Sequence, residues 1–343
     1  MARVVHLSAA DRAEVFDCAL REHPDMAFCH VDHSHASSTD ESFLKAAYQA
    51  PDLRPKLFSL ARAGFMAYVL RNGVTSFVRH DAIRNLWIPV KEGAYSIDAN
   101  DVVYTYSPPA LATAAPGMVV VFSSIAPTSL AAPLARHFFQ NFPSLQKYVP
   151  PDCGILRIAD LGGVTGAYYM NTHARPENEL HIQGLIRNIL TAHGVPMDRV
   201  VLYGTSKGGT GALLHALLGG YHAVAVDPIV SDTHYIQKHR DLHLVQDIFP
   251  VEKSERFSRL FAAVPREQTP RLSIITSRRS PQFSYMSDVL GAGWSEKAAV
   301  FDIDNPAIRD HPDVGPNSVH IAVMLMNMFL NRLHAPPGLR AVA

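Results

Sequence analysis

The chain has 343 residues, of which 48% are hydrophobic and 18% are charged, a composition typical of a folded globular protein rather than a disordered one. Lys plus Arg and Asp plus Glu both number 31, so no net charge favours nucleic acid or an anionic membrane surface as a partner. Three cysteines without a CxxC spacing argue against a disulfide framework or a zinc ribbon and favour the cytoplasm. No apolar run is long enough to predict a membrane span.

Residues 1–115 are predicted to form an N-terminal α+β extension. Helices are expected at residues 9–22 and 41–70, and the second is interrupted at Pro51 and Pro55. Runs rich in β-branched and aromatic residues predict short strands at residues 75–79, 86–90, 94–97 and 102–106. The last of these runs either complete the extension or add antiparallel edge strands to the main sheet.

From residue 117 onward, short apolar segments alternate with helices. Strands are predicted at residues 118–123, 155–159, 200–203, 223–226, 272–276 and 298–303. Helices are predicted near residues 130–142, 178–193, 208–218, 252–263, 283–290 and 319–333. Unbroken apolar strands are typical of parallel sheets buried on both faces. We therefore expect an α/β core over residues 116–335, with a mostly parallel central sheet flanked by helices, and a flexible tail at residues 336–343.

The segment from Gly204 to Gly208 reads Gly-Thr-Ser-Lys-Gly and lies between a predicted strand and a predicted helix. The G-x-S-x-G pattern in this context is typical of a nucleophile elbow, in which Ser206 projects its hydroxyl from a strained turn. The backbone N–H of Lys207, at the helix start, is a candidate donor to a transition-state oxyanion. The alternative is a glycine-rich turn that holds a phosphate, although neither a Walker A ending nor a G-x-G-x-x-G pattern is present.

Around this elbow, residues 117–333 resemble the α/β-hydrolase superfamily. Within it, the segment Tyr-Gly-Thr-Ser-Lys-Gly-Gly at residues 203–209 and Ala-Val-Asp-Pro-Ile at residues 225–229 look like those of capsular polysaccharide biosynthesis proteins of the XcbB/CpsF type. The resemblance implies an esterase or O-acyltransferase that acts on a glycan or other small molecule. It implies no resident cofactor, with an acyl donor such as acetyl-CoA if the protein is a transferase.

In this superfamily the nucleophile, the acid and the histidine follow one another along the chain. The loop after the last predicted strand, residues 304–318, contains His311, which is our candidate for the general base. His320, one residue inside the following helix, is the alternative base. A histidine in either place also fits a surface residue without a catalytic role.

The acid is expected after one of the later strands. The commoner place is the loop at residues 277–283, which contains no carboxylate before Asp288. Asp227, after the strand at residues 223–226, is the leading candidate, and Asp288 is the alternative. Asp232, Asp304 or a dyad without an acid remain open as well.

The second oxyanion donor is expected from the backbone N–H of Ser124 or Ile125, after the strand at residues 118–123. The Lys207 side chain either meets an anionic group of the substrate or is simply solvated.

Two further segments have open interpretations. Residues 29–35, Cys-His-Val-Asp-His-Ser-His, fit a polar loop or the mouth of the active site better than a metal site. Residues 168–173 fit either packing or a wall of the substrate site. The sequence therefore predicts a serine acyl-transfer enzyme, while the missing carboxylate at residues 277–283 favours an alternative, a non-catalytic binding or assembly factor.

Overall fold

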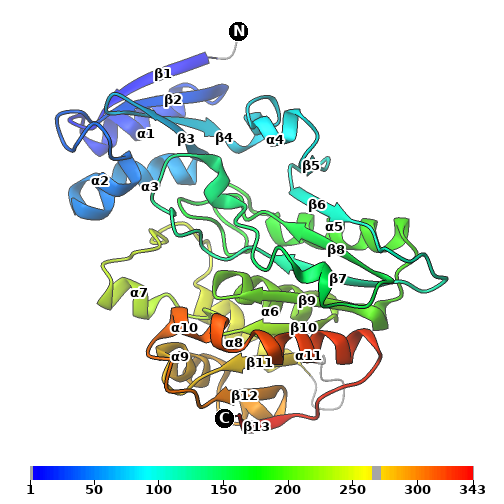
Figure 1. The fold of residues 1–343 in the computed structure, drawn as a ribbon. Helices are drawn as coiled ribbons and strands as arrows, with labels where there is room; N and C mark the ends of the chain where they lie inside the picture. Colours follow the sequence, from blue (N-terminus) through cyan, green and yellow to red (C-terminus); the bar gives the residue numbers. More distant parts are fainter. Residues whose placement is uncertain (1–2, 265–271, 343) are drawn as a thin grey trace.

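The computed structural model describes residues 3–264 and 272–342, which contain two β-sheets (Figure 1). The smaller sheet has the strand order β1-β2-β4-β3, and only its β1–β2 pair is parallel. Its strands are β1 (Arg3–Ser8), β2 (Met26–Asp32), β3 (Phe65–Arg71) and β4 (Val74–Arg79). Helices α1 (Ala13–Glu22), α2 (Phe43–Gln49) and α3 (Arg54–Arg62) belong to the same part of the chain.

The hairpin between β3 and β4 corrects the helix predicted over residues 41–70. Only α2, a short 3₁₀ helix (Pro51–Leu53) and α3 lie in that range, and from Phe65 the chain is a strand. Asn72 and Gly73 both have positive φ, at +50° and +76°, as a two-residue hairpin turn requires. The Asn-Gly pair was therefore a turn signal within the sequence.

Two other predictions for this region are wrong. Residues 29–32, read as part of a polar loop, belong to β2, and β1 was not predicted. Residues 86–90, predicted as a strand, follow a 3₁₀ helix (His80–Asn85) and enter helix α4 (Ile88–Lys91), where Pro89 fits because the first helical turn needs no backbone donor.

The larger sheet has nine strands in the order β13-β12-β11-β10-β9-β7-β8-β6-β5. Strands β7 to β13 run parallel to one another, whereas β5 and β6 form an antiparallel edge beside β8. Their bounds are β5 (Ser96–Ile97), β6 (Val103–Ser107), β7 (Gly117–Phe122), β8 (Cys153–Ile158), β9 (Val200–Thr205), β10 (His222–Val226), β11 (Leu272–Thr276), β12 (Ala299–Ile303) and β13 (Gly338–Val342). The sheet is thus mostly parallel, as predicted.

Both faces of this sheet are buried, because side chains alternate between two apolar clusters. Val120 and Phe122 pack on one face, while Val119 and Val121 pack on the other. The first face is covered by α5 (Asn178–Ala192), α6 (Lys207–Gly219), α8 (Lys253–Ala263) and α9 (Pro281–Leu290). The second face is covered by α10 (His311–Asn317) and α11 (Val319–Leu330). This arrangement is the helix-covered parallel sheet that the sequence predicted.

Two predictions for the core are wrong. The helix expected at residues 130–142 is reduced to a 3₁₀ turn (Leu134–His137), since Pro133 lacks a backbone donor and Phe142 has a positive φ of +50°. The expected flexible tail instead forms β13, whose residues pair in register with β12. Ala343 lies outside the described residues.

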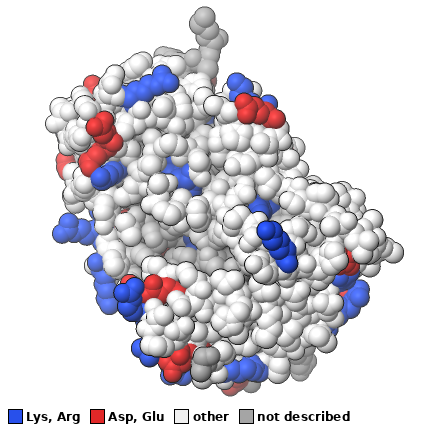
Figure 2. Space-filling view, viewed as in Figure 1, with Lys and Arg blue, Asp and Glu red and all other residues white. Residues whose placement is uncertain are grey.

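The small sheet packs onto the large one through loops that also approach the carboxyl ends of β8 and β10. Val164 and Leu244 lie in the same apolar cluster as the N-terminal strands and helices. The buried Arg136 guanidinium donates to the carbonyls of Ala67 in β3 and Val164, at 2.8 and 3.4 Å. Charged side chains are scattered over the face in Figure 2. Within residues 3–264 and 272–342, no helix is long and apolar enough to span a membrane.

Candidate active site

Ser206 lies in the sharp turn between β9 and α6, with a φ of +55° and a ψ of −121°. This conformation is strained for a residue with a side chain, and strain of this kind clusters at functional sites. The turn directs the Ser206 hydroxyl into a pocket at the carboxyl ends of the parallel strands. The local geometry is that of a nucleophile elbow.

Glycine is required on both sides of Ser206. A Cβ atom at Gly204 would overlap the carbonyl oxygen of Gly208, and one at Gly208 would overlap that of Phe122 in β7. A Cβ at Gly209 would lie 2.7 Å from the carbonyl oxygen of Val226. The start of α6 therefore packs against two strands at backbone contact distance, which sets the position of Ser206.

His311 and Asp227 complete a hydrogen-bonded chain with Ser206. Nε2 of His311 lies 2.7 Å from Oγ of Ser206, and Nδ1 of His311 lies 2.7 Å from Oδ2 of Asp227. An Nδ1–H directed at the carboxylate leaves Nε2 free to accept the serine proton. The structure thus brings together the three residues that the sequence analysis placed first.

The Asp227 carboxylate is itself held by two hydroxyl groups. Thr276 Oγ1 donates to Oδ1 at 2.7 Å, and Ser280 Oγ donates to Oδ2 at 2.6 Å. Asp227 is only 2% exposed, so these bonds replace water as partners of the buried charge. Together with His311 they fix the orientation of both carboxylate oxygens.

The alternative acids and base lie elsewhere. Asp288 on α9 and His320 on α11 are exposed and do not line the pocket. Asp232 forms an ion pair with Lys253 at 2.5 Å, and Asp304 pairs with Arg279 at 3.2 Å. None of these four side chains is therefore placed to bond to His311 or Ser206.

One of the two oxyanion donors after β7 is already engaged. The backbone N–H of Ser124 donates to Oδ1 of Asn141 at 2.9 Å, and the Ser124 hydroxyl lies 2.6 Å from Oγ1 of Thr205. Ser124 therefore positions the elbow strand, and of the two predicted alternatives the N–H of Ile125 remains the candidate donor. Ile125 lines the pocket, and Lys207 is the first residue of α6, so its N–H has no partner within the helix.

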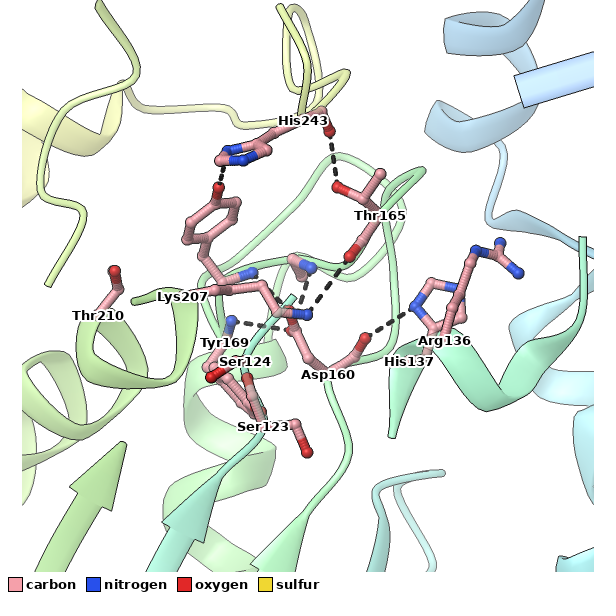
Figure 3. A network of polar contacts seen from close by, with 12 residues as sticks. Ser123, Ser124, Arg136, His137, Asp160, Thr165, Tyr169, Lys207, Thr210 and His243 are labelled. Atoms are coloured by element: carbon pink, nitrogen blue, oxygen red, sulfur yellow. Dashed lines mark hydrogen bonds and ion pairs between the residues drawn. The ribbon is translucent and has the colours of Figure 1, made fainter. Parts of the chain in front are cut away.

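The Lys207 side chain does not reach the substrate pocket, which corrects the prediction of a substrate contact or a solvated lysine. It is fully buried and forms an ion pair with Oδ2 of Asp160 at 2.8 Å (Figure 3). Nζ also donates to the carbonyl of Thr165 at 3.3 Å. The residue after the nucleophile thus anchors α6 to the loop that follows β8.

Asp160 organises that loop through its carboxylate. The backbone N–H groups of Ala167, Tyr168 and Tyr169 all donate to it, each at 3.0 Å. Tyr168 and Tyr169 are fully buried, so of the two interpretations of residues 168–173 packing applies to these two. Sequence reasoning had not singled out Asp160, because a single aspartate after a strand carries no distinctive signal.

The pocket in front of Ser206 has a volume of about 420 Å³. Its first side is the loop after β7, with Ile125, Ala126 and Pro127. Its second side belongs to helix α7 (Thr233–Lys238) and the segment after it, from which His234, Tyr235, His239 and His243 line the pocket. These residues were not predicted, although the three histidines within the ten residues 234–243 were a usable signal.

The histidines at residues 30–35 lie outside this pocket. His33 is fully buried and bonds through its ring nitrogens to the hydroxyls of Ser37 and Thr75, at 2.9 and 2.8 Å. His30 Nδ1 lies 2.6 Å from the Ser76 hydroxyl. These residues stabilise the small sheet and do not form the mouth of the active site.

No protein-family model matches the sequence, and no curated protein is significantly similar to it. Among solved structures, the capsule O-acetyltransferase of Neisseria meningitidis serogroup A superposes with a TM-score of 0.50 at 15% identity, over 68% of this chain and 92% of that chain. The chain has an α/β-hydrolase fold. Two esterases superpose on the α/β-hydrolase fold of this chain with lower scores. An arylesterase has a TM-score of 0.46 at 14% identity, over 85% of this chain and 97% of that chain. Carboxyl esterase 2 from Tuber melanosporum has a TM-score of 0.46 at 12% identity, over 68% and 82%.

The order of the bonded residues along this chain, Ser206, Asp227 and His311, is the order of nucleophile, acid and histidine in α/β-hydrolases. Asp227 follows β10 rather than β11, and its φ of +45° turns the side chain toward the histidine loop. Ser280, from the loop after β11, supplies a hydroxyl to the same carboxylate. The absence of a carboxylate at residues 277–283 is therefore compatible with a complete Ser-His-Asp arrangement.

Proposed function

We propose that this protein is a serine acyl-transfer enzyme that forms an acyl-enzyme on Ser206. The observation that carries the proposal is the pair of 2.7 Å contacts that link Ser206 to His311 and His311 to Asp227 at a strained elbow. The three residues follow three different strands, β9, β10 and β12, and a purely structural role gives no reason for a serine hydroxyl to lie at that turn.

In the proposed mechanism, Oγ of Ser206 attacks the carbonyl carbon of an ester while Nε2 of His311 accepts the hydroxyl proton. Asp227 keeps the opposite proton on Nδ1 and stabilises the imidazolium. The carbonyl oxygen becomes an oxyanion, which accepts hydrogen bonds from the N–H groups of Lys207 and Ile125. The tetrahedral intermediate collapses, and Nε2 returns the proton to the departing alcohol. Water or an acceptor hydroxyl then repeats the sequence on the acyl-enzyme.

The finer proposal concerns the substrate. The resemblance of residues 203–209 and 225–229 to capsular polysaccharide biosynthesis proteins supports a sugar or polysaccharide hydroxyl as the group that gains or loses the acyl chain. If the reaction is a transfer, acetyl-CoA is the proposed donor. The cytoplasm is the proposed compartment, where Cys18, Cys29 and Cys153 would stay in the free state that the structure records.

A serine-directed fluorophosphonate probe and p-nitrophenyl acetate test the catalytic proposal. Ser206→Ala is expected to abolish labelling, and His311→Ala and Asp227→Asn to reduce the rate by about 10³-fold or more. Asp288→Asn, a carboxylate on the surface of α9, is the matched control and is expected to behave as wild type. Equal labelling of wild type and Ser206→Ala would overturn the proposal.

The donor is tested separately by mass spectrometry of the protein after incubation with acetyl-CoA. An acetyl group on Ser206 that disappears when glucose is added would support transfer to a sugar. Acetylation from p-nitrophenyl acetate but not from acetyl-CoA would favour an esterase. The non-catalytic alternative rested on the missing acid, and the contact of Asp227 with His311 supports the catalytic proposal instead.

A further inference from the structure

His243 is a buried histidine that borders the pocket yet belongs to none of the catalytic contacts described above. It is 6% exposed and lies in the segment after α7. Its ring packs against Tyr235, with the ring centroids 3.9 Å apart, and Tyr235 also lies close to His311. The ring is therefore held beside the triad by aromatic packing rather than by an ion pair.

Two residues of the loop after β8 hold His243 in place, as Figure 3 shows for Thr165 and His243. Thr165 Oγ1 donates to the carbonyl oxygen of His243 at 2.7 Å. The hydroxyl of Tyr168 lies 2.5 Å from Nδ1 of His243. The main chain and one ring nitrogen are thus fixed by a loop that the ion pair between Asp160 and Lys207 attaches to the elbow helix.

These contacts determine which ring nitrogen carries the proton. Burial raises the pKa of the Tyr168 hydroxyl well above its ordinary value, so the tyrosine stays protonated. Within the described part of the chain its hydroxyl has no acceptor other than Nδ1, so the O–H donates to that nitrogen. Burial, with the charge of Lys253 as the next cause, lowers the pKa of His243 well below its usual range. The imidazole is therefore neutral, with its proton on Nε2.

Nε2–H is the ring group of His243 that remains available to a ligand in the pocket. Within residues 3–264 and 272–342 no other group forms a hydrogen bond with this nitrogen, whereas Nδ1 and the carbonyl oxygen are both engaged. A neutral N–H group held in one tautomer is a directional donor, and it needs an acceptor when a ligand displaces water.

The two sides of the pocket differ in chemistry. Ile125, Ala126 and Pro127 form an apolar side next to one proposed oxyanion donor, and this side suits an acyl chain. The side that contains His243 also presents His234 and His239, whose Nε2 atoms lie 3.1 Å apart. Ring nitrogens of this kind suit the hydroxyl groups of an alcohol.

We propose that His243 is a specificity residue that donates a hydrogen bond from Nε2–H to an oxygen on the alcohol side of the substrate, such as a sugar hydroxyl. Tyr168 and Thr165 are positioning residues that fix its tautomer and its backbone. This inference rests on the proposed function and deepens it, because it assigns the acyl and alcohol parts of the ester to opposite sides of the pocket.

The tautomer is tested without turnover by ¹⁵N NMR of the histidine rings. Wild type is expected to show His243 protonated at Nε2, with no titration between pH 5 and 8. Tyr168→Phe removes the donor to Nδ1 and is expected to give a mixture of tautomers. A proton on Nδ1 in wild type, or a titration near pH 6.5, would contradict the assignment.

The binding role is tested by comparing kcat/KM for p-nitrophenyl acetate with kcat/KM for monoacetylated glucose. In His243→Asn the amide oxygen can accept from Tyr168 but no donor reaches the pocket, whereas the longer amide of His243→Gln can place an N–H near the position of Nε2. The ratio of sugar ester to aryl ester is expected to fall about tenfold in His243→Asn, as the loss of one hydrogen bond predicts, and to recover partly in His243→Gln. His320→Asn, an exposed histidine on α11, is the control.

The outcomes separate the two proposals. Equal losses on both esters, no loss on the sugar ester, or hydrolysis of the aryl ester alone by wild type would each overturn the specificity role while leaving Ser206 chemistry intact. Failure of wild type to hydrolyse either ester, together with no labelling of Ser206, would instead overturn the proposed function, and the specificity role with it.

Discussion

Replacing Lys207 by methionine removes the positive charge of a fully buried ion pair but keeps a long unbranched side chain in the same space. Asp160 would still accept three backbone hydrogen bonds, from residues 167, 168 and 169. The reciprocal change, Asp160→Asn, removes the negative charge beside the Lys207 ammonium and leaves only neutral acceptors such as the Thr165 carbonyl at 3.3 Å. The two changes therefore differ in how well the remaining charge is satisfied.

Breaking a buried pair from one side costs about 3–5 kcal/mol. We expect Lys207→Met to lie at the lower end, near about 3 kcal/mol, and Asp160→Asn near about 5 kcal/mol, because only the carboxylate keeps several donors. The double variant is expected to be more stable than Asp160→Asn alone, since it removes the unpaired ammonium. Urea unfolding followed by tryptophan fluorescence measures the three free energies.

The order of the three unfolding free energies tests whether the ion pair anchors the elbow helix. An Asp160→Asn variant that is more stable than Lys207→Met, or a double variant less stable than either, would refute the assignment of the ion pair as the anchor of the elbow helix. A loss below about 1 kcal/mol in Lys207→Met would show that the buried charge is better solvated than the contacts indicate.

Three further predictions concern glycine, cysteine and histidine. Gly204→Ala is expected to lower the free energy of unfolding by more than about 4 kcal/mol, because its Cβ would overlap backbone atoms. A Cβ at Gly184 in α5 meets nothing within 4 Å, so Gly184→Ala is expected to raise this free energy by about 0.5–1 kcal/mol. Thermal unfolding measures both, and equal effects would contradict the contact at Gly204. In native protein at pH 8, iodoacetamide is expected to modify the exposed Cys18 and spare Cys29, whose pKa burial raises to about 12, as peptide mass spectrometry can show. Burial lowers the pKa of His215 to about 4, so as the pH drops from 6.5 toward 4 the unfolded state binds a proton before the folded state does and the free energy of unfolding should fall. His215→Gln should flatten this pH dependence, which urea unfolding over the same pH range can measure.

The parallel strands β7 to β12 of the large sheet were predictable because they are short, mostly apolar runs. Strands such as β9 and β10 are buried on both faces of the sheet, so nearly every residue in them is apolar. The small sheet was harder, because β3 continues directly from the helical pattern of α3. There the Asn72-Gly73 turn was the better guide than periodicity.

Some residues of the candidate site were likewise predictable from the sequence, and others were not. Ser206 and His311 follow from the order of motifs along the chain, and Asp227 follows from its place after a strand. The hydroxyls that hold Asp227 and the histidines on the second side of the pocket depend on how loops distant in sequence meet. His243 is fixed by a residue 75 positions away, a separation that no local pattern encodes.

The second side of the pocket also has a neighbour in the N-terminal region. The Tyr48 hydroxyl donates to the carbonyl of His239 at 3.4 Å, and Leu244, which follows His243, packs within the apolar core of the small sheet. Substitutions far upstream in the gene are thus able to reshape the second side of the pocket without touching the nucleophile. Under the proposed function, substitutions in α2 are expected to alter acceptor choice with unchanged fluorophosphonate labelling, which a directed-evolution library of α2 variants can measure.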